Sequence, residues 1–112
     1  MDFLAKTPAP SYYAVIFTSE RTVEDGEGYG VMAERMQELA AKQPGFLGIE
    51  SAHDAEGRGI TVSYWQSLDA IRVWGEHAEH RVAQAVGKGR WYERFRLRVC
   101  KVEREDTFER GL

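Results

Sequence analysis

Hydrophobic positions near the start of the chain first form a continuous run and then fall into a helical period. Residues 12–18 are almost wholly apolar and β-prone, which predicts a central strand. The polar, glycine-containing stretch 19–28 predicts a loop. Apolar residues then recur at spacings of three and four and predict an amphipathic helix: Tyr29, Met32, Met36 and Leu39. Pro44 and Gly45 end this helix.

Two short β-rich segments follow that turn. Residues 46–53 and 59–65 have the composition of strands, and residues 54–58 between them have the composition and length of a hairpin loop. We therefore expect the two strands to pair antiparallel.

A second helix and a last strand complete the pattern. Ser67 is a suitable N-cap, and the apolar residues after it recur at helical spacing: Ile71, Trp74, Ala78, Val82 and Ala85. Gly75 is a point at which this helix is expected to be interrupted, and the glycines of 87–89 end it. Apolar and arginine residues alternate after residue 94, which predicts a strand over 92–103.

The predicted order is strand, helix, strand, strand, helix, strand. This is the βαββαβ pattern of an α+β, ferredoxin-like antiparallel sheet with both helices on one face. A chain of 112 residues has the length of one domain, so we expect a single domain over 1–112 with an ordered core of about 12–104.

The first strand is apolar on both of its faces, which bears on assembly. Tyr12, Ala14 and Ile16 share one face and Tyr13, Val15 and Phe17 the other. Helices cover only one face of such a sheet, and exposing three large side chains on the other forgoes about 1.5–3 kcal/mol each. A second copy of the chain is the simplest cover, so we expect a homodimer. The alternative is that the chain's own lead-in or tail folds over the sheet.

Charge and composition exclude several classes of partner. Fifteen Lys and Arg against eighteen Asp and Glu give a formal net charge of -3, which lacks the basic excess of a nucleic-acid-binding protein. No apolar run approaches the roughly 20 residues of a membrane span, and the start of the chain does not resemble a signal peptide. We therefore expect a cytoplasmic protein. Its single cysteine, Cys100, is expected to be a buried structural thiol.

The densest cluster of chemically versatile side chains is aromatic and contains two histidines: Tyr64, Trp65, Trp74, His77, His80, Trp91 and Tyr92. His77 falls at the edge of the predicted apolar stripe, where an imidazole can face a cavity between helix and sheet, whereas an unbroken helix turns His80 toward solvent. Structural roles compete with these functional ones, because large aromatics at such spacings are usually core or interface residues. There is no metal-binding motif, and the glycines near residue 28 are a weak phosphate-binding signal.

Four segments together resemble the antibiotic-biosynthesis monooxygenase domain family: FTSERT, GYGVMAERMQELAAKQPGFLGIES, ITVSYWQSLDAIRVWGEHAEH and WYERFRLRVCKVER. The resemblance covers about residues 12–104 and implies a dimeric α+β barrel in which two ferredoxin-like sheets face each other. The family includes cofactor-independent oxygenases of aromatic polyketides and haem-degrading enzymes. The haem-degrading branch uses a helical His ten residues after a helical Trp and an Asn on the first strand. Ten residues after Trp74 stands Gln84, and residues 12–19 contain no Asn, which argues against haem degradation.

These observations lead to two functional hypotheses. In the first, the protein is a monooxygenase that oxidises a small phenolic or other aromatic molecule with O2 and uses neither a cofactor nor a metal. His77 is then the catalytic base because imidazole titrates near neutral pH, and Trp74 holds the substrate. The expected lining of the pocket is Trp65, Tyr64, His80, Met32 and Met36. In the second, a dimer of the same fold binds a small molecule or haem without turnover; an isomerase or a regulatory ligand-binding domain is a remoter possibility.

Overall fold

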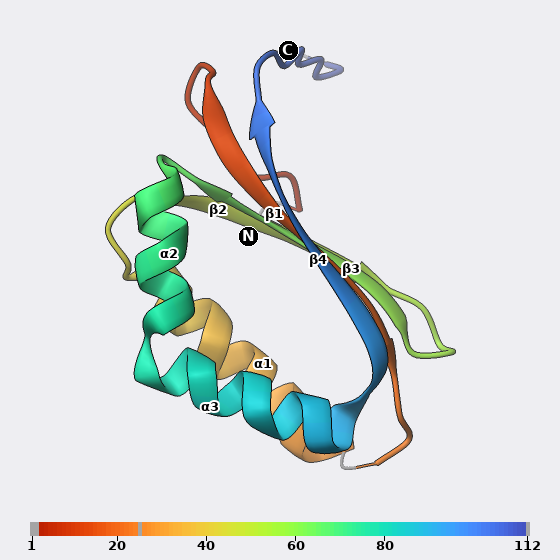
Figure 1. Ribbon diagram of the computed structural model, residues 1–112. Helices are drawn as coiled ribbons and strands as arrows, with labels where there is room; N and C mark the ends of the chain where they lie inside the picture. Colours follow the sequence, from red (N-terminus) through yellow and green to blue (C-terminus); the bar gives the residue numbers. More distant parts are fainter. Residues whose placement is uncertain (1–2, 25, 112) are drawn as a thin grey trace.

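A computed structural model describes residues 3–24 and 26–111 and confirms the ferredoxin-like α+β fold. The elements in chain order are β1 (Tyr12–Arg21), α1 (Gly26–Ala41), β2 (Phe46–His53), β3 (Arg58–Trp65), α2 (Leu68–Glu76), α3 (Ala78–Val86), a π-helical turn η1 (Gly87–Trp91) and β4 (Tyr92–Val102). The strands form one antiparallel sheet in the order β2-β3-β1-β4, and the helices all lie on one side of it (Figure 1). Within the described ranges, no helix has both the length and the apolar character needed to span a membrane.

β1 continues three residues past the strand predicted from its apolar run. Ser19 and Glu20 lie in the segment expected to be a loop, but both pair with β3 on one side and β4 on the other. A central strand has its backbone hydrogen bonds satisfied along both edges, and this pairing overrides the polar character of the side chains. The loop is therefore shorter than predicted, and α1 begins at Gly26.

The second predicted helix is broken in two. His77 separates α2 from α3 with an extended backbone (φ -61°, ψ 133°), so the interruption expected at Gly75 occurs two residues later. The break changes the direction of the chain, and the apolar stripe does not continue through it: Val82 and Ala85, predicted to be buried, are exposed. The side chain of Ala78 lies outside the described part of the structure.

The start of α2 is fixed by the predicted cap. The Ser67 hydroxyl oxygen accepts a hydrogen bond from the Ala70 backbone N–H at 3.0 Å, and Asp69 stands in the first turn. Ser67→Ala is expected to lower the free energy of unfolding by about 1 kcal/mol, because one backbone donor of the first turn loses its partner. Thermal or urea denaturation measures this. Ser67→Asp, which keeps an acceptor, is the control; equal losses in both variants would contradict the capping role.

A tight turn brings the end of α1 close to the start of α2. Gly45 has a φ of 85°, and a Cβ atom at this position would lie 2.7 Å from the Cβ of Ala70. Its carbonyl oxygen accepts a hydrogen bond from the Gln66 backbone N–H at 2.7 Å. Only glycine satisfies both the conformation and the close approach. The Pro-Gly pair that ends α1 therefore also positions α2.

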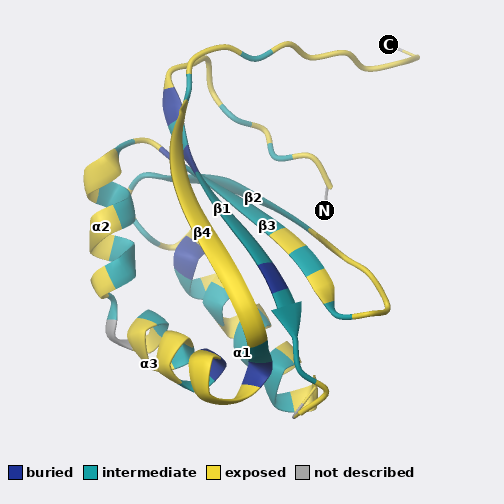
Figure 2. Cartoon of the chain, turned by 45° about the vertical axis from the view of Figure 1, so that its right-hand side comes forward, coloured by how far each residue is buried: buried dark blue, intermediate teal, exposed yellow. Residues whose placement is uncertain are grey.

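The two faces of the sheet differ sharply. We call the face toward the helices the inner face and the opposite one the back face. The two groups of β1 residues predicted from alternation lie on opposite faces: Tyr13, Val15 and Phe17 on the inner face, and Tyr12, Ala14 and Ile16 on the back face. Strand pairing then places Phe95, Leu97 and Val99 of β4 on the inner face, and Arg94, Arg96, Arg98 and Cys100 on the back face. β4 is an edge strand and is exposed along almost its whole length (Figure 2).

The lead-in before β1 covers one end of the back face. The Ala5 N–H donates to the Glu50 carboxylate at 3.0 Å, and the hydroxyls of Thr7 and Tyr12 lie 3.0 Å apart. Tyr12 and Ala14 are consequently buried, whereas Ile60, farther along this face, is 51% exposed. The lead-in therefore folds over the sheet, as the alternative to a dimer supposed, but it covers only part of the back face.

Cys100 is exposed, so the prediction of a buried thiol is wrong. It lies on the back face of the edge strand β4, opposite Ala14. Alternation along the sequence indicates that a residue belongs to a strand, but it does not indicate whether that strand lies at the edge of the sheet.

Candidate functional site

Three aromatic rings from three different elements form a stack on the inner face. Trp65, the last residue of β3, is fully buried, and its ring lies 6.3 Å from that of Trp74 on α2 at an interplanar angle of 24°. The imidazole of His80 on α3 lies 4.5 Å from the Trp74 ring at 22°. Trp65 is further fixed by a hydrogen bond from its indole N–H to the Ser63 hydroxyl at 2.9 Å. The stack therefore extends from the buried sheet to the helical layer.

The hydrogen bonding of His80 indicates which of its nitrogens carries the proton. Nδ1 lies 3.0 Å from the carbonyl oxygen of Trp74, and a carbonyl oxygen only accepts hydrogen bonds. Nδ1 must therefore be protonated, and in the neutral imidazole Nε2 carries the lone pair. Burial lowers the pKa of His80 below its ordinary 6.5, the Trp74 carbonyl raises it, and the neighbouring His77 lowers it again; the net direction is downward. His80 is thus neutral at pH 7, with Nε2 able to accept a proton.

The break in the helix is what brings His80 to this position. Sequence analysis placed His80 toward solvent on the assumption of an unbroken helix, and that assumption is wrong. Because α3 starts anew after His77, its first turn folds back so that His80 reaches the carbonyl of Trp74 near the end of α2. The same carbonyl also accepts the His77 backbone N–H at 3.1 Å.

His77 itself lies at the junction of the two helices. Its ring centroid is 5.4 Å from that of Trp74, and its backbone caps both helices, since its carbonyl accepts the Arg81 N–H at 2.9 Å. The Nδ1 atom is buried and has no hydrogen-bond partner among the described atoms. His77 is therefore part of the cluster, as expected, and it combines this place with a structural role at the helix ends.

The lowered pKa of His80 predicts that stability depends on pH. The unfolded state binds a proton near pH 6.5, whereas the folded state binds it only at lower pH, so the free energy of unfolding falls as the pH drops below about 6.5. Urea denaturation at pH 7.5, 6.5 and 5.5 measures the slope. His80→Asn is expected to reduce that slope, and an unchanged slope would show that His80 is not the group responsible.

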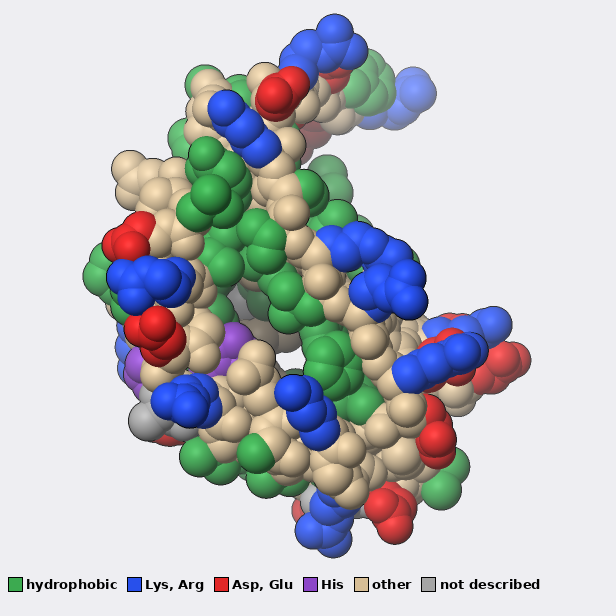
Figure 3. Space-filling model, in the orientation of Figure 1, with side chains coloured by type: hydrophobic (Ala, Val, Ile, Leu, Met, Phe, Trp, Pro, Cys, Tyr) green, Lys and Arg blue, Asp and Glu red, His purple; other side chains and the backbone are tan. Residues whose placement is uncertain are grey.

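Next to this stack, the space between the helices and the sheet is hollow. Figure 3 shows hydrophobic side chains on the walls of a hollow between α2, α3 and β4, with histidine atoms at its helical side. α1 packs on β2 and α2 on β3, while α3 packs on α1, so the helices lie over one half of the sheet. The inner face of β4 is left open, and Phe95, Leu97 and Val99 are 37–45% exposed there.

A second aromatic group closes the sheet end opposite the stack. The Phe17 ring lies 5.3 Å from that of Tyr92 and 5.1 Å from that of Phe95, and Tyr92 also contacts Tyr29 on α1 at 5.9 Å. Burial raises the pKa of Tyr92, so this phenol stays protonated. The inner face thus offers an apolar surface with aromatic rings at both ends.

The remaining predicted site residues are placed as follows. Met32 and Met36 are half-buried on α1, in helical register with Tyr29. Tyr64 lies on the back face instead: its ring contacts Tyr12, its hydroxyl donates to Glu50 at 2.6 Å, and burial together with Glu50 raises its pKa. The structure therefore brings Trp65, Trp74, His77 and His80 together, and separates Tyr64 from them by the thickness of the sheet.

Sequence reasoning missed the apolar wall formed by β4. The alternation along β4 predicted a strand. Which of its residues lie on the inner face follows from its pairing with β1, and the sequence alone does not show that pairing. No group of three or more His, Cys, Asp or Glu side chains that could hold a metal occurs over residues 3–24 and 26–111. What the cluster can do is hold a planar apolar molecule against the aromatic rings and accept a proton on an imidazole.

Comparison with known proteins places this chain in a family. The family model described as antibiotic biosynthesis monooxygenase matches residues 14–86. A Bacillus subtilis (strain 168) relative, uncharacterized protein YqjZ, is 58% identical over 109 residues, which cover 97% of this chain and 95% of the relative.

Solved structures share the fold at low sequence identity. A variant of SnoaB, a cofactor-independent oxygenase from Streptomyces nogalater, superposes with a TM-score of 0.70 at 14% identity and covers 90% of this chain and 100% of its own. A putative antibiotic biosynthesis monooxygenase from Caulobacter crescentus CB15 gives 0.72 at 14% identity, covering 84% and 92%. PA3566 from Pseudomonas aeruginosa gives 0.70 at 9% identity, covering 88% and 99%. These structures share the fold, and the family model matches more than half of the chain; the chain therefore belongs to the antibiotic biosynthesis monooxygenase family.

Proposed function

We propose that this protein is a cofactor-independent monooxygenase that oxidises a small, electron-rich phenolic or related aromatic molecule with O2. The observation that carries the proposal is the stack of Trp65, Trp74 and His80 beside the apolar hollow. It supplies a surface for a flat ring and, on His80, a neutral imidazole whose Nδ1 proton is held by the Trp74 carbonyl.

The proposed reaction needs a base beside an apolar surface that holds the substrate. Nε2 of His80 removes a proton from the substrate, which becomes an electron-rich anion. The anion passes one electron to O2, and the two radicals combine to form a carbon–oxygen bond. The peroxide takes up the proton from the imidazolium and loses water, so that an anthrone methylene and O2 yield a quinone carbonyl and H2O. The apolar side chains of β4 and the aromatic rings give the anion a largely apolar surrounding on the inner face.

An oxygen electrode tests the proposal directly. Oxygen uptake in the presence of a panel of quinols and anthrones, above the rate without protein and unaffected by a metal chelator, is the expected result. A parallel absorption titration with haemin tests the alternative of a binding protein. A saturable haem spectrum without oxygen uptake from any quinol or anthrone would overturn the oxygenase proposal in favour of that alternative.

We propose further that the protein is a homodimer built through the back face. Its support is the uncovered part of that face, where Ile60 and the whole back of β4 are exposed although the lead-in covers the other end. An exposed apolar side chain near a row of charges, here Ile60 across β1 from the arginines of β4, is typical of a protein interface. Sedimentation at micromolar concentration tests it, and a compact 12.8 kDa monomer would contradict it.

A further inference from the structure

The last part of the chain extends away from its own fold. Residues 103–111, which we call the C-terminal arm, have no helix or strand and continue beyond the end of β4 (Figures 1 and 2). Phe108 in the arm is 81% exposed, and Arg110 lies over its ring at 5.8 Å. The base of the arm is held in place by a hydrogen bond from the Thr7 hydroxyl to the Glu105 carboxylate at 3.1 Å. A segment whose start is held by a hydrogen bond and whose aromatic side chain is exposed has the features of one that binds another surface.

The arm is acidic, and the back face of β4 is basic. The arm holds four acids (Glu103, Glu105, Asp106 and Glu109) and two arginines. On the back face, Arg94 is paired with Glu20 at 2.8 Å, but Arg96 and Arg98 take part in no ion pair with any residue that the structure describes. Opposite charges of this kind favour association between surfaces and set its orientation.

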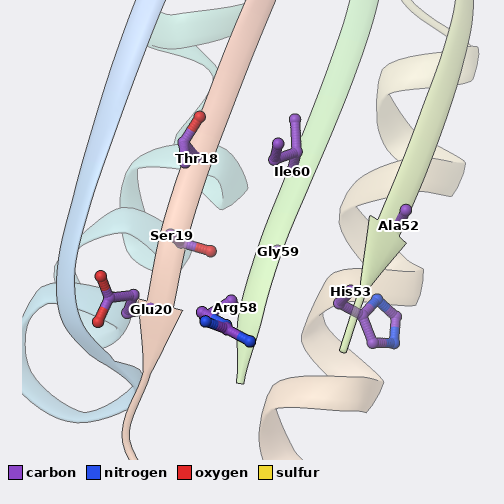
Figure 4. Close-up of a pocket in the computed structure, with 8 residues that line it drawn as sticks. All are labelled: Thr18, Ser19, Glu20, Ala52, His53, Arg58, Gly59 and Ile60. Carbon is purple, nitrogen blue, oxygen red and sulfur yellow. The ribbon is translucent and has the colours of Figure 1, made fainter. Parts of the chain in front are cut away.

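The back face also holds a shallow pocket next to these arginines. It has a volume of about 370 Å³ and is lined by Thr18, Ser19, Glu20, Ala52, His53, Arg58, Gly59 and Ile60. Figure 4 shows the pocket with the helices behind the strands, so it opens on the side of the sheet away from them. Thr18 pairs with Arg96, which places the pocket beside the unpaired arginines. The space is sufficient for a phenyl ring.

The arm and the pocket of one chain lie at opposite ends of the sheet. The arm begins after Val102, which pairs with Tyr12, whereas the pocket begins at Thr18, roughly 20 Å away along β1 at 3.3 Å per residue. The arm points away from its own pocket (Figure 1). In a twofold pair with back faces together and strands running in opposite directions, each arm runs toward the pocket of the other subunit.

We propose that the C-terminal arm of each subunit docks on the back face of a second copy of this chain, with Phe108 in the pocket formed by Thr18, Ala52 and Ile60. The acids of the arm then lie beside Arg96 and Arg98. The inference rests on the homodimer proposed above and adds the contact that completes it. An aromatic side chain that fills a pocket is a common anchor of an interface, and the surrounding charges set its orientation.

Disulfide trapping between two different variants tests the contact. In a Cys100→Ser background, ¹⁵N-labelled Phe108→Cys chains are mixed with unlabelled Ile60→Cys chains, oxidised and digested. Mass spectrometry is expected to find mixed-isotope peptides that join positions 108 and 60. The control uses Val31→Cys in place of Ile60→Cys. Val31 is 67% exposed and lies on α1, away from the back face. Joined peptides that are no more abundant than in the control would overturn the proposal.

Sedimentation of the Phe108→Ala protein gives an independent result. We expect the dissociation constant of the dimer to rise by about tenfold for each arm that loses its ring. Val31→Ala is the control and leaves it unchanged. A dimer whose dissociation constant is insensitive to Phe108→Ala overturns the arm contact and leaves the homodimer standing, whereas a wild-type chain that sediments as a monomer overturns both. Oxygen uptake is measured in a separate experiment, so neither sedimentation result confirms or overturns the proposed oxygenase reaction.

Discussion

His80→Asn is expected to lower the turnover of a quinol or anthrone substrate by about 10²- to 10⁴-fold, the usual effect of removing a general base. Asparagine places an amide N–H close to the position of Nδ1, so the hydrogen bond to the Trp74 carbonyl is kept, while the proton acceptor at Nε2 is lost. The variant therefore separates the chemical role of His80 from its capping of α2. Steady-state oxygen uptake with a substrate identified from the wild-type panel measures the change.

His77→Ala provides the matched comparison, because His77 is the base that the sequence favoured. We expect it to lower stability through the helix junction and to retain most of the turnover number of the folded protein. The pH dependence of kcat/KM in the wild type should show an acidic limb below pH 6.5, which disappears in His80→Asn. If His77→Ala abolished turnover while His80→Asn preserved it, the base would be His77 instead.

Trp65→Ala is expected to have the largest effect on stability, about 3–5 kcal/mol. The side chain is fully buried, packs against Phe46 and Trp74, and donates a hydrogen bond to Ser63. Truncation removes apolar contacts, opens a cavity under the stack and leaves the Ser63 hydroxyl without that donor. Equilibrium denaturation in urea followed by far-UV circular dichroism measures the loss.

Two further variants show whether the loss comes from the cavity. Trp65→Phe keeps most of the ring and is expected to cost less than Trp65→Ala. Val31→Ala removes an exposed apolar side chain from α1 and is expected to change stability by less than about 0.5 kcal/mol. A Trp65→Ala loss no larger than that of Val31→Ala would mean that the stack does not stabilise the fold.

The order of elements could be predicted from the sequence because each element has a strong local signal. The apolar run of β1, the Pro-Gly turn and the Ser67 cap all depend on residues that are neighbours in the chain. The break at His77 was misplaced by two residues because its position depends on the hydrogen bonds at the helix ends and not on helix propensity alone. Gly75 is the residue with weak helix propensity, but the chain turns where a carbonyl of α2 can bind the side chain of α3.

Half of the candidate site was predictable and half was not. Trp65, Trp74 and the two histidines were identified from their density in the sequence, and the structure places them together. Tyr64 was grouped with Trp65 because the two are adjacent, although adjacent residues of a strand point to opposite faces. The exposure of Cys100 and of the inner face of β4 depends on strand order, which is set by long-range pairing.

The break between α2 and α3 has a consequence for how such a protein diversifies. The indole of Trp74 and the imidazole of His80 belong to separate helices, α2 and α3, which are joined by the Trp74 carbonyl and by the stacking of the two rings. Substitutions in α3 can therefore change the position of the His80 imidazole, which accepts the proton, while the Trp74 indole and the sheet beneath it stay in place. One scaffold can in this way accommodate differently shaped reactants without a new architecture.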